Sequence, residues 1–214
     1  KDVRSKIQLL NEFLFSEVGF RGNVDNYYDY RNSLLNHVLD TKQGIPLSLS
    51  ALYVCICRCI GVEHVDMIGL PGHFLLEIPS DDALDNNSNS RLFIDVFNGG
   101  RFLSIQDCRN LVASYGYPWG ESMLEKVSPQ LALKRMLNNL EQCHKGDKNM
   151  PLLMQLQLLR ITERSNSNSN IMCEFLTRFP AVLFQESLSK QYLTAPIYLQ
   201  VMHFFESQQL PNRH

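Results

Sequence analysis

Apolar residues are most densely grouped between residues 43 and 100, and their pattern predicts a helix followed by strands. From about Pro46 to Ile60 they fall on every side of a helix, and the gaps hold serine, alanine and three cysteines. A helix that is apolar all round is a buried one. Pro46 suits the first turn, because the N–H that proline lacks would be unpaired there. Gly61 supplies a stop. We therefore expect this helix at the centre of the core.

Two runs of bulky apolar residues after this helix have the length and composition of strands. The first covers residues 73–78 (HFLLEI), and the second covers 92–97 (LFIDVF), whose one charge is Asp95. Residues 65–70 predict a further short strand before them, and residues 101–103 predict one that pairs back after them. The polar segment SDDALDNNSNS between the two main strands predicts an exposed, mobile hairpin loop.

The N-terminal segment predicts a helix and then a loop. Residues 1–18 carry apolar residues at helical spacing, with Gly19 as a stop. The next segment is rich in Gly, Asn, Asp and Tyr, and its aromatic side chains need burial, so we expect an ordered loop. These aromatic residues either anchor the loop by packing or form a rim to a cleft; they are Phe20, Tyr27 and Tyr28.

Two further helices have N-terminal capping signals. Asn32 or Ser33 is positioned to cap a helix whose apolar stripe lies within residues 34–39. Ser104 precedes another helical segment and has Asp107 three residues later, the spacing of a capping box.

Beyond the strands the pattern is helical only. A helix over residues 128–144 is followed by three more helical segments, separated by polar breaks such as SNSNSN. Pairs of helices at this spacing resemble tetratricopeptide-like hairpins. We therefore expect an α+β domain over residues 1–145, with a small antiparallel sheet, and a helical region over residues 146–214.

Composition and charge narrow the class of protein. The chain has 44% hydrophobic and 20% charged residues and a net charge of −2, which is typical of a globular protein. Neither nucleic acid nor a membrane is favoured as a partner, because there is no basic excess and no apolar run of roughly 20 residues. No signal-peptide pattern opens the sequence, and the absence of an initiator Met predicts a trimmed piece of a longer protein. The scattered cysteines favour reduced thiols and a cytoplasmic location.

The order of helix, strand beginning with His73 and strand containing Asp95 resembles the transglutaminase-like core, a papain-related Cys/His/Asp scaffold. Between about Ile7 and Leu140, six short motifs look like the SirB1 family, which includes the middle region of certain F-box proteins. These motifs are NEFLF, GFRGN, YYDYRNSLLNHVL, GIPLSLSALY, LPGHFLLEI and IDVFNGG. The resemblance implies a central buried helix packed on a small antiparallel sheet, followed by helical hairpins.

Catalysis on this scaffold needs a thiolate at the start of the buried helix, where the helix dipole lowers the pKa of the thiol, with an imidazole and a carboxylate beside it. His73 and Asp95 match the base and the orienting acid. No cysteine stands at residues 44–48, and Cys55 lies roughly 10 Å further along the helix than Ser48, at about 1.5 Å per residue. Ser48 is therefore the candidate hydroxyl nucleophile, or else it hydrogen-bonds the local backbone.

The three cysteines of the central helix are predicted to be buried, reduced and free of metal. Cys55 and Cys59 share one helical face while Cys57 points elsewhere, so at most two thiols converge. Zinc would need two more ligands, and no Cys-x-x-Cys motif or close histidine pair supplies them. We expect no metal and no cofactor.

Two functions from different classes follow. In the first, the domain is a pseudoenzyme, a binding or regulatory module that docks a protein partner. In the second, it is a hydrolase or acyl transferase that uses His73 and Asp95 with a nucleophile still to be identified. The missing cysteine favours the first. The resemblance also implies partners, because it links bacterial members to regulation of invasion genes and eukaryotic members to substrate recognition for ubiquitin ligation.

Overall fold

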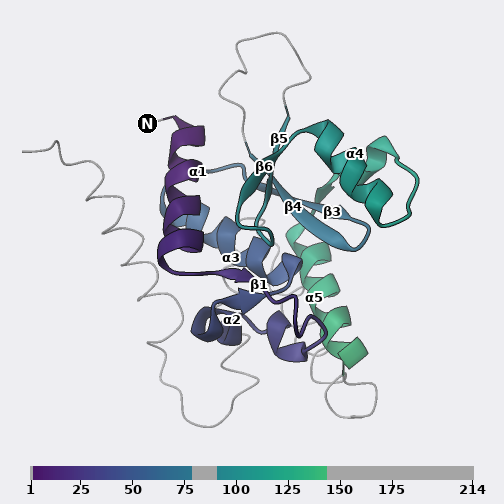
Figure 1. The fold of residues 1–214 in the computed structure, drawn as a ribbon, viewed down its shortest axis with the longest axis horizontal. Coiled ribbons are helices and arrows are strands. Elements are labelled where there is room, and N and C mark those ends of the chain that lie inside the picture. Colours follow the sequence, from purple (N-terminus) through teal and green to yellow (C-terminus); the bar gives the residue numbers. More distant parts are fainter. Residues whose placement is uncertain (1, 79–90, 144–214) are drawn as a thin grey trace, which may run out of the picture.

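The computed structural model describes residues 2–78 and 91–143 of the 214-residue chain (Figure 1). The predicted hairpin insert and the predicted C-terminal helices lie outside the described residues. The helices are α1 (Val3–Asn11), the π-helical η1 (Glu12–Glu17), the 3-10 helix η2 (Tyr30–Ser33), α2 (Leu35–Thr41), α3 (Pro46–Cys59), α4 (Ile105–Ser114), the 3-10 helix η3 (Glu121–Leu124) and α5 (Pro129–Cys143). The strands are β1 (Arg21–Gly22), β2 (Gln43–Gly44), β3 (Asp66–Leu70), β4 (His73–Ile78), β5 (Leu92–Asp95), β6 (Arg101–Leu103) and β7 (Lys126–Val127).

The main sheet has five strands in the order β6-β5-β4-β3-β7, and every neighbouring pair in it is antiparallel. The tight turn at Pro71 and Gly72 joins β3 to β4, where Leu70 pairs with His73. Strands β1 and β2, which precede α3 in the sequence, form a separate parallel pair. The fold is therefore α+β, as the sequence predicts, and β4 and β5 are neighbours in the sheet.

Helix α3 and helix α4 cover opposite faces of the sheet (Figure 1). Leu76 in β4 packs in the cluster that contains α3, whereas Leu75 packs in the cluster that contains α4. Successive strand side chains point to opposite faces, so a strand covered on both sides needs apolar residues at every position. This burial explains why Phe74, Leu75 and Leu76 in β4 are consecutive apolar residues.

The N-terminal cap of α2 differs from the prediction. The N-cap position is Leu34, which makes no side-chain capping hydrogen bond, while Asn32 and Ser33 are buried within η2. The Asn32 side-chain amide donates to the carbonyl oxygens of Asn26 and Tyr27, so it ties the preceding loop together. Tertiary burial therefore overrides the local capping signal of these two residues. The Ser104 capping box forms as predicted.

The cysteines of α3 are not all buried, which corrects the prediction. Cys57 is buried, Cys55 is half-buried and Cys59 is exposed. The last turn of α3 leaves the core, as the exposed Arg58 also indicates. The predicted burial is therefore confirmed for Cys57, only partial for Cys55 and wrong for Cys59.

No helix within the described ranges is long and apolar enough to cross a membrane.

Candidate functional site

His73 and Asp95 lie side by side, as predicted. His73 begins β4 and Asp95 ends the neighbouring β5, and the His73 Nε2 atom is 2.9 Å from the Asp95 Oδ1 atom. Both side chains are almost fully buried. The chain turns directly after Asp95, where the Asn98 N–H donates to the Asp95 carbonyl oxygen, so β5 is two residues shorter than predicted.

The Asp95 carboxylate accepts five hydrogen bonds, one from His73 and two each from Asn98 and Arg101. Burial alone would raise the pKa of Asp95, but the hydrogen bonds from His73, Asn98 and Arg101 outweigh burial and hold the pKa below its usual range. The carboxylate is therefore ionised near neutral pH. Because it can only accept hydrogen bonds, His73 Nε2 carries the proton in this contact.

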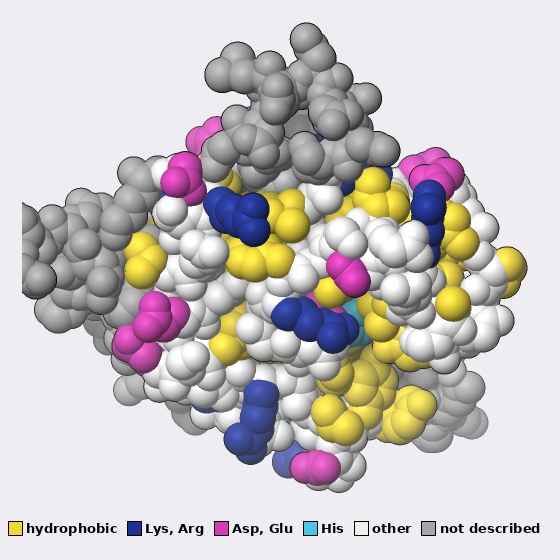
Figure 2. Space-filling view, turned by 45° about the horizontal axis from the view of Figure 1, so that its top comes forward, with side chains coloured by type: hydrophobic (Ala, Val, Ile, Leu, Met, Phe, Trp, Pro, Cys, Tyr) yellow, Lys and Arg dark blue, Asp and Glu magenta, His cyan; other side chains and the backbone are white. Residues whose placement is uncertain are grey.

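Aromatic rings hold the imidazole in place. The Phe97 ring contacts His73 edge-on at 5.9 Å between centroids, and the Tyr115 ring lies at 6.4 Å. Tyr27 in turn makes an edge contact with Phe97. On the face of the molecule drawn in Figure 2, a histidine is visible beside a basic side chain and a group of hydrophobic side chains. Packing on these rings fixes the orientation of the His73 side chain.

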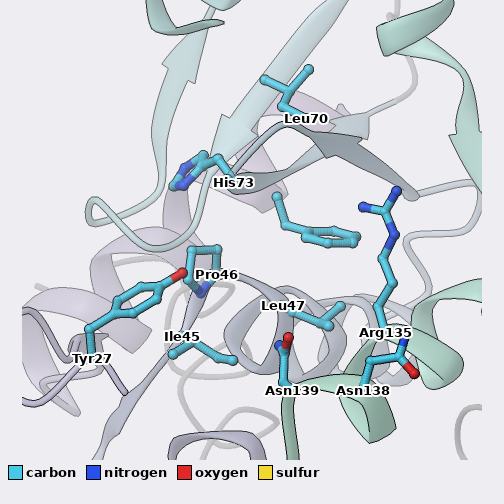
Figure 3. Close-up of a pocket in the computed structure, with 11 residues that line it drawn as sticks. Tyr27, Ile45, Pro46, Leu47, Leu70, His73, Arg135, Asn138 and Asn139 are labelled. Atoms are coloured by element: carbon cyan, nitrogen blue, oxygen red, sulfur yellow. The ribbon is translucent and has the colours of Figure 1, made fainter. Parts of the chain in front are cut away.

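A pocket of about 260 Å³ lies beside His73 (Figure 3). Four segments form its walls: the loop that carries Tyr27, the start of α3, the turn between β3 and β4 with the residues on either side of it, and one face of α5. Figure 3 shows His73 and Tyr27 on one side of this space and the α5 residues on the other. The lining residues are Tyr27, Ile45, Pro46, Leu47, Leu70, Gly72, His73, Phe74, Arg135, Asn138 and Asn139.

The start of α3 presents no nucleophile to this pocket. Its lining residues Ile45, Pro46 and Leu47 have hydrocarbon side chains. Ser48 is not among the residues that line it and is fully buried. The pocket therefore has the expected base, His73, on its wall beside an apolar helix start, with the orienting acid Asp95 buried behind His73.

Ser48 is engaged with the backbone. Its Oγ atom accepts a hydrogen bond from the Ile45 N–H at 3.1 Å and donates one to the Asn32 carbonyl oxygen at 2.6 Å. Both Ser48 and His73 are described, and no hydrogen bond joins them. A Cβ atom at Gly44 would come within 2.8 Å of Ser48 Oγ, so the glycine leaves room for this arrangement. These contacts favour a structural role for the hydroxyl.

The cysteines do not form a metal site within the part of the chain that the structure describes, where no cluster of three or more metal-binding side chains occurs. Burial raises the pKa of the Cys57 thiol far above its usual value. Burial also raises the pKa of Cys108 to about 12. Neither thiol is therefore a reactive thiolate at neutral pH.

Sequence reasoning missed the contribution of α5 to the pocket. Arg135, Asn138 and Asn139 have i, i+3 and i+4 spacing, which places them on one helical face. From the sequence alone such a polar face indicates contact with solvent. For the aromatic loop the sequence allows two roles, plain packing or a rim to a cleft. Tyr27 lines the pocket, which agrees with the rim.

An α+β domain with a buried helix on an antiparallel sheet, and a His–Asp pair beside the N-terminus of that helix, has the architecture of the transglutaminase-like class. The family described as Transglutaminase-like superfamily matches residues 1–138, and the chain belongs to this superfamily.

Relatives come from bacteria and animals. The chain is similar to a UPF0162 protein of Xylella fastidiosa, with 35% identity over 141 residues, which are 63% of this chain and 47% of that protein. It is also similar to the human F-box only protein 21, with 30% identity over 135 residues, which are 63% of this chain and 21% of that protein. The chain thus spans less than half the length of these two relatives. No solved structure matches the chain significantly.

Proposed function

We propose that this transglutaminase-like domain is a non-catalytic binding or regulatory module, and that the pocket beside His73 receives a segment of a protein partner. One observation carries the proposal: the helix start that faces the pocket consists of Ile45, Pro46 and Leu47. The chemistry of this class needs a nucleophile at that position. Apolar side chains there make contact surface for a ligand instead.

In this proposal the His73–Asp95 pair has a structural task. His73 links the start of β4 to the end of β5, while Asn98 and Arg101 join the following turn and β6 to the same carboxylate. A buried polar network whose members are all satisfied makes the local structure rigid. The pair therefore shapes one wall of the pocket without transferring a proton.

The nature of the relatives supports a protein partner. The similarity to F-box only protein 21 agrees with the resemblance that links eukaryotic members to substrate recognition. The same proposal includes three further assignments. These are membership of the SirB1 family, a tetratricopeptide-like region over residues 146–214 and a cytoplasmic location. In this proposal, the helical region offers the partner a second docking surface.

A second candidate function is that of a hydrolase or acyl transferase. The 2.9 Å contact between His73 and Asp95 favours it, because an imidazole oriented by a carboxylate is the usual form of a general base. This function also needs a nucleophile, for which Ser48 is the candidate. Its hydroxyl would have to leave the Asn32 carbonyl oxygen and turn toward the imidazole.

Covalent probes separate the two functions. We would incubate the wild-type protein and His73→Ala with serine-directed and cysteine-directed reagents, measure the intact mass and map any adduct. A binding module should give no adduct on Ser48. Cys59 is exposed, so it should react with the thiol reagent equally in both proteins. An adduct on Ser48 that forms only when His73 is present would establish the enzyme and refute the binding module.

A further inference from the structure

We propose that the pocket recognises a carboxylate, carried either at the C-terminus of a peptide or on an aspartate or glutamate side chain within it. The inference rests on the proposed function and adds the chemical class of the ligand. It starts from the α5 side of the pocket, which the His73–Asp95 pair does not use.

Arg135 brings a positive charge to the pocket without a carboxylate partner among the described residues. Its guanidinium lies over the Phe74 ring, 5.2 Å from the ring centroid. A Cβ atom at Gly69 would come within 2.5 Å of Arg135 Nη1, so the guanidinium lies in a space that only glycine leaves open. By contrast, Arg91 and Arg109 each form an ion pair with a glutamate. Arg135 is therefore held by ring and backbone packing, and no hydrogen bond to another described residue occupies its donors.

The other polar groups of the pocket also suit an anion. Among the described residues that line it, none is an aspartate or a glutamate. Asn138 and Asn139 add side-chain amides, which can donate hydrogen bonds, on the same face of α5 as Arg135. A guanidinium beside neutral donors is a good receptor for a carboxylate, because the planar fork of arginine can bind both oxygens at once.

The start of α3 strengthens this preference. The N-cap residue Ile45 makes no side-chain capping bond, and Pro46 has no N–H to donate. The N–H groups of the first turn have no partner within the helix, and the helix dipole places partial positive charge at this end. Because Ile45, Pro46 and Leu47 line the pocket, this potential acts on whatever the pocket binds.

The surroundings of the pocket favour a peptide over a small free acid. Tyr27 lines the pocket. The ring of Tyr28, which is 87% exposed, contacts the Tyr27 ring edge-on. Tyr115, which lies against His73, is 47% exposed. Exposed aromatic surface thus continues outward from the rim, where the apolar side chains of an extended chain can pack. The volume of about 260 Å³ is below the roughly 300–1,000 Å³ of pockets for drug-sized ligands, so only part of such a chain enters.

Three pools of randomised hexapeptides test the proposal. The first has a free C-terminal carboxylate and no acidic residue, the second has a C-terminal amide and one internal glutamate, and the third has a C-terminal amide and no acid. Binding is followed through the side-chain amide signals of Asn138 and Asn139 in NMR spectra of the full chain, together with affinity by calorimetry. We expect the first pool, the second or both to bind and the third to bind at least tenfold more weakly. The stronger of the first two identifies the source of the carboxylate.

Matched variants locate the effect. Arg135→Gln should weaken binding of the acidic pool at least tenfold, while Arg109→Gln, on α4 and outside the pocket, should not change it. Asn138→Asp places a carboxylate on an exposed position of the same wall and should abolish binding without disturbing the fold. Binding should also weaken as sodium chloride is raised, because salt screens the attraction.

Other outcomes overturn the proposal in distinguishable ways. If the neutral pool binds as well as the acidic ones and Arg135→Gln changes nothing, the binding module stands and carboxylate recognition fails. If no pool binds, carboxylate recognition also fails. An adduct on Ser48 that depends on His73 refutes the proposed function alone, since an enzyme can bind an acidic substrate in the same pocket.

Discussion

The two sides of the pocket differ in how their polar groups are used. At the ends of β4 and β5, the Asp95 carboxylate accepts five hydrogen bonds and the His73 ring is packed between aromatic residues. At the start of α3, the side chains of Ile45, Pro46 and Leu47 line the pocket. The hydroxyl of Ser48 does not face the pocket and donates a hydrogen bond to the backbone carbonyl oxygen of Asn32.

This difference teaches that the His73–Asp95 pair is part of a hydrogen-bond network with a structural consequence of its own, whether or not a nucleophile stands nearby. A buried carboxylate with several donors around it is costly to disrupt one residue at a time, because each single change leaves another group unpaired. The side chains of Ile45, Pro46 and Leu47, which face the pocket at the helix start, are hydrocarbon and take no part in such a network. Substitutions in the network should therefore cost more stability than substitutions in α3.

The largest loss of stability is expected for Asp95→Ala. The change leaves His73 and the side chains of Asn98 and Arg101 without their acceptor, so the free energy of unfolding should fall by about 3–5 kcal/mol, as when one partner of a buried ion pair is removed. Urea denaturation followed by circular dichroism measures it. Asp66→Ala is the control, because its ion pair with Lys126 is partly exposed and should contribute at most about 1 kcal/mol. Equal losses in the two variants would contradict the structural role of the pair.

His73→Ala should cost less, about 1–3 kcal/mol of unfolding free energy, because Asp95 keeps its bonds to Asn98 and Arg101. The same denaturation experiment measures the loss. His64→Asn serves as the control: His64 is exposed and has a positive φ, a conformation that asparagine tolerates. A melting temperature for His73→Ala equal to that of the wild type would favour an enzyme over a non-catalytic binding module.

The pH dependence of stability should contain a contribution from Asp95. Its pKa is lower in the folded state than its usual value of 3.8, so the unfolded state binds the proton more readily. This contribution is therefore complete above about pH 5 and is lost as the pH falls through 3.8 toward the folded-state pKa. Denaturation curves between pH 7 and pH 3 should show a shallower decline for Asp95→Asn than for the wild type. Parallel declines would show that Asp95 does not titrate differently in the two states.

The smallest effects should come from two serines of α3. Ser48→Ala removes one buried acceptor and one buried donor and should cost about 1 kcal/mol. Ser50 is equally buried, but its Oγ atom has no hydrogen-bond partner among the described residues, so Ser50→Ala should be neutral or slightly stabilising. Thermal melts of the two variants compare them directly. A larger loss for Ser50→Ala would mean that its hydroxyl has a partner.

Local patterns in the sequence determined the elements of this protein. The unbroken apolar pattern of α3 predicted a buried helix, and the apolar runs of β4 and β5 predicted neighbouring strands. These two predictions, with the family motifs, were enough to place His73 beside Asp95. In an antiparallel hairpin the start of the first strand lies beside the end of the second, and these are the positions of His73 and Asp95. The physical reason is that helical and strand periodicity reflect burial, which is the strongest signal a single sequence carries.

Only the tertiary structure decided how the remaining polar residues are used. Ser48 accepts a hydrogen bond from the nearby Ile45 N–H, as the local interpretation predicts, and it also donates to the backbone carbonyl oxygen of Asn32, 16 positions earlier in the chain. The polar face of α5 became a wall of the pocket, and Cys59 left the core at the end of an apolar helix. Each of these outcomes depends on which segment packs against a given face. Packing of that kind brings together residues far apart in the sequence, so no local pattern records it.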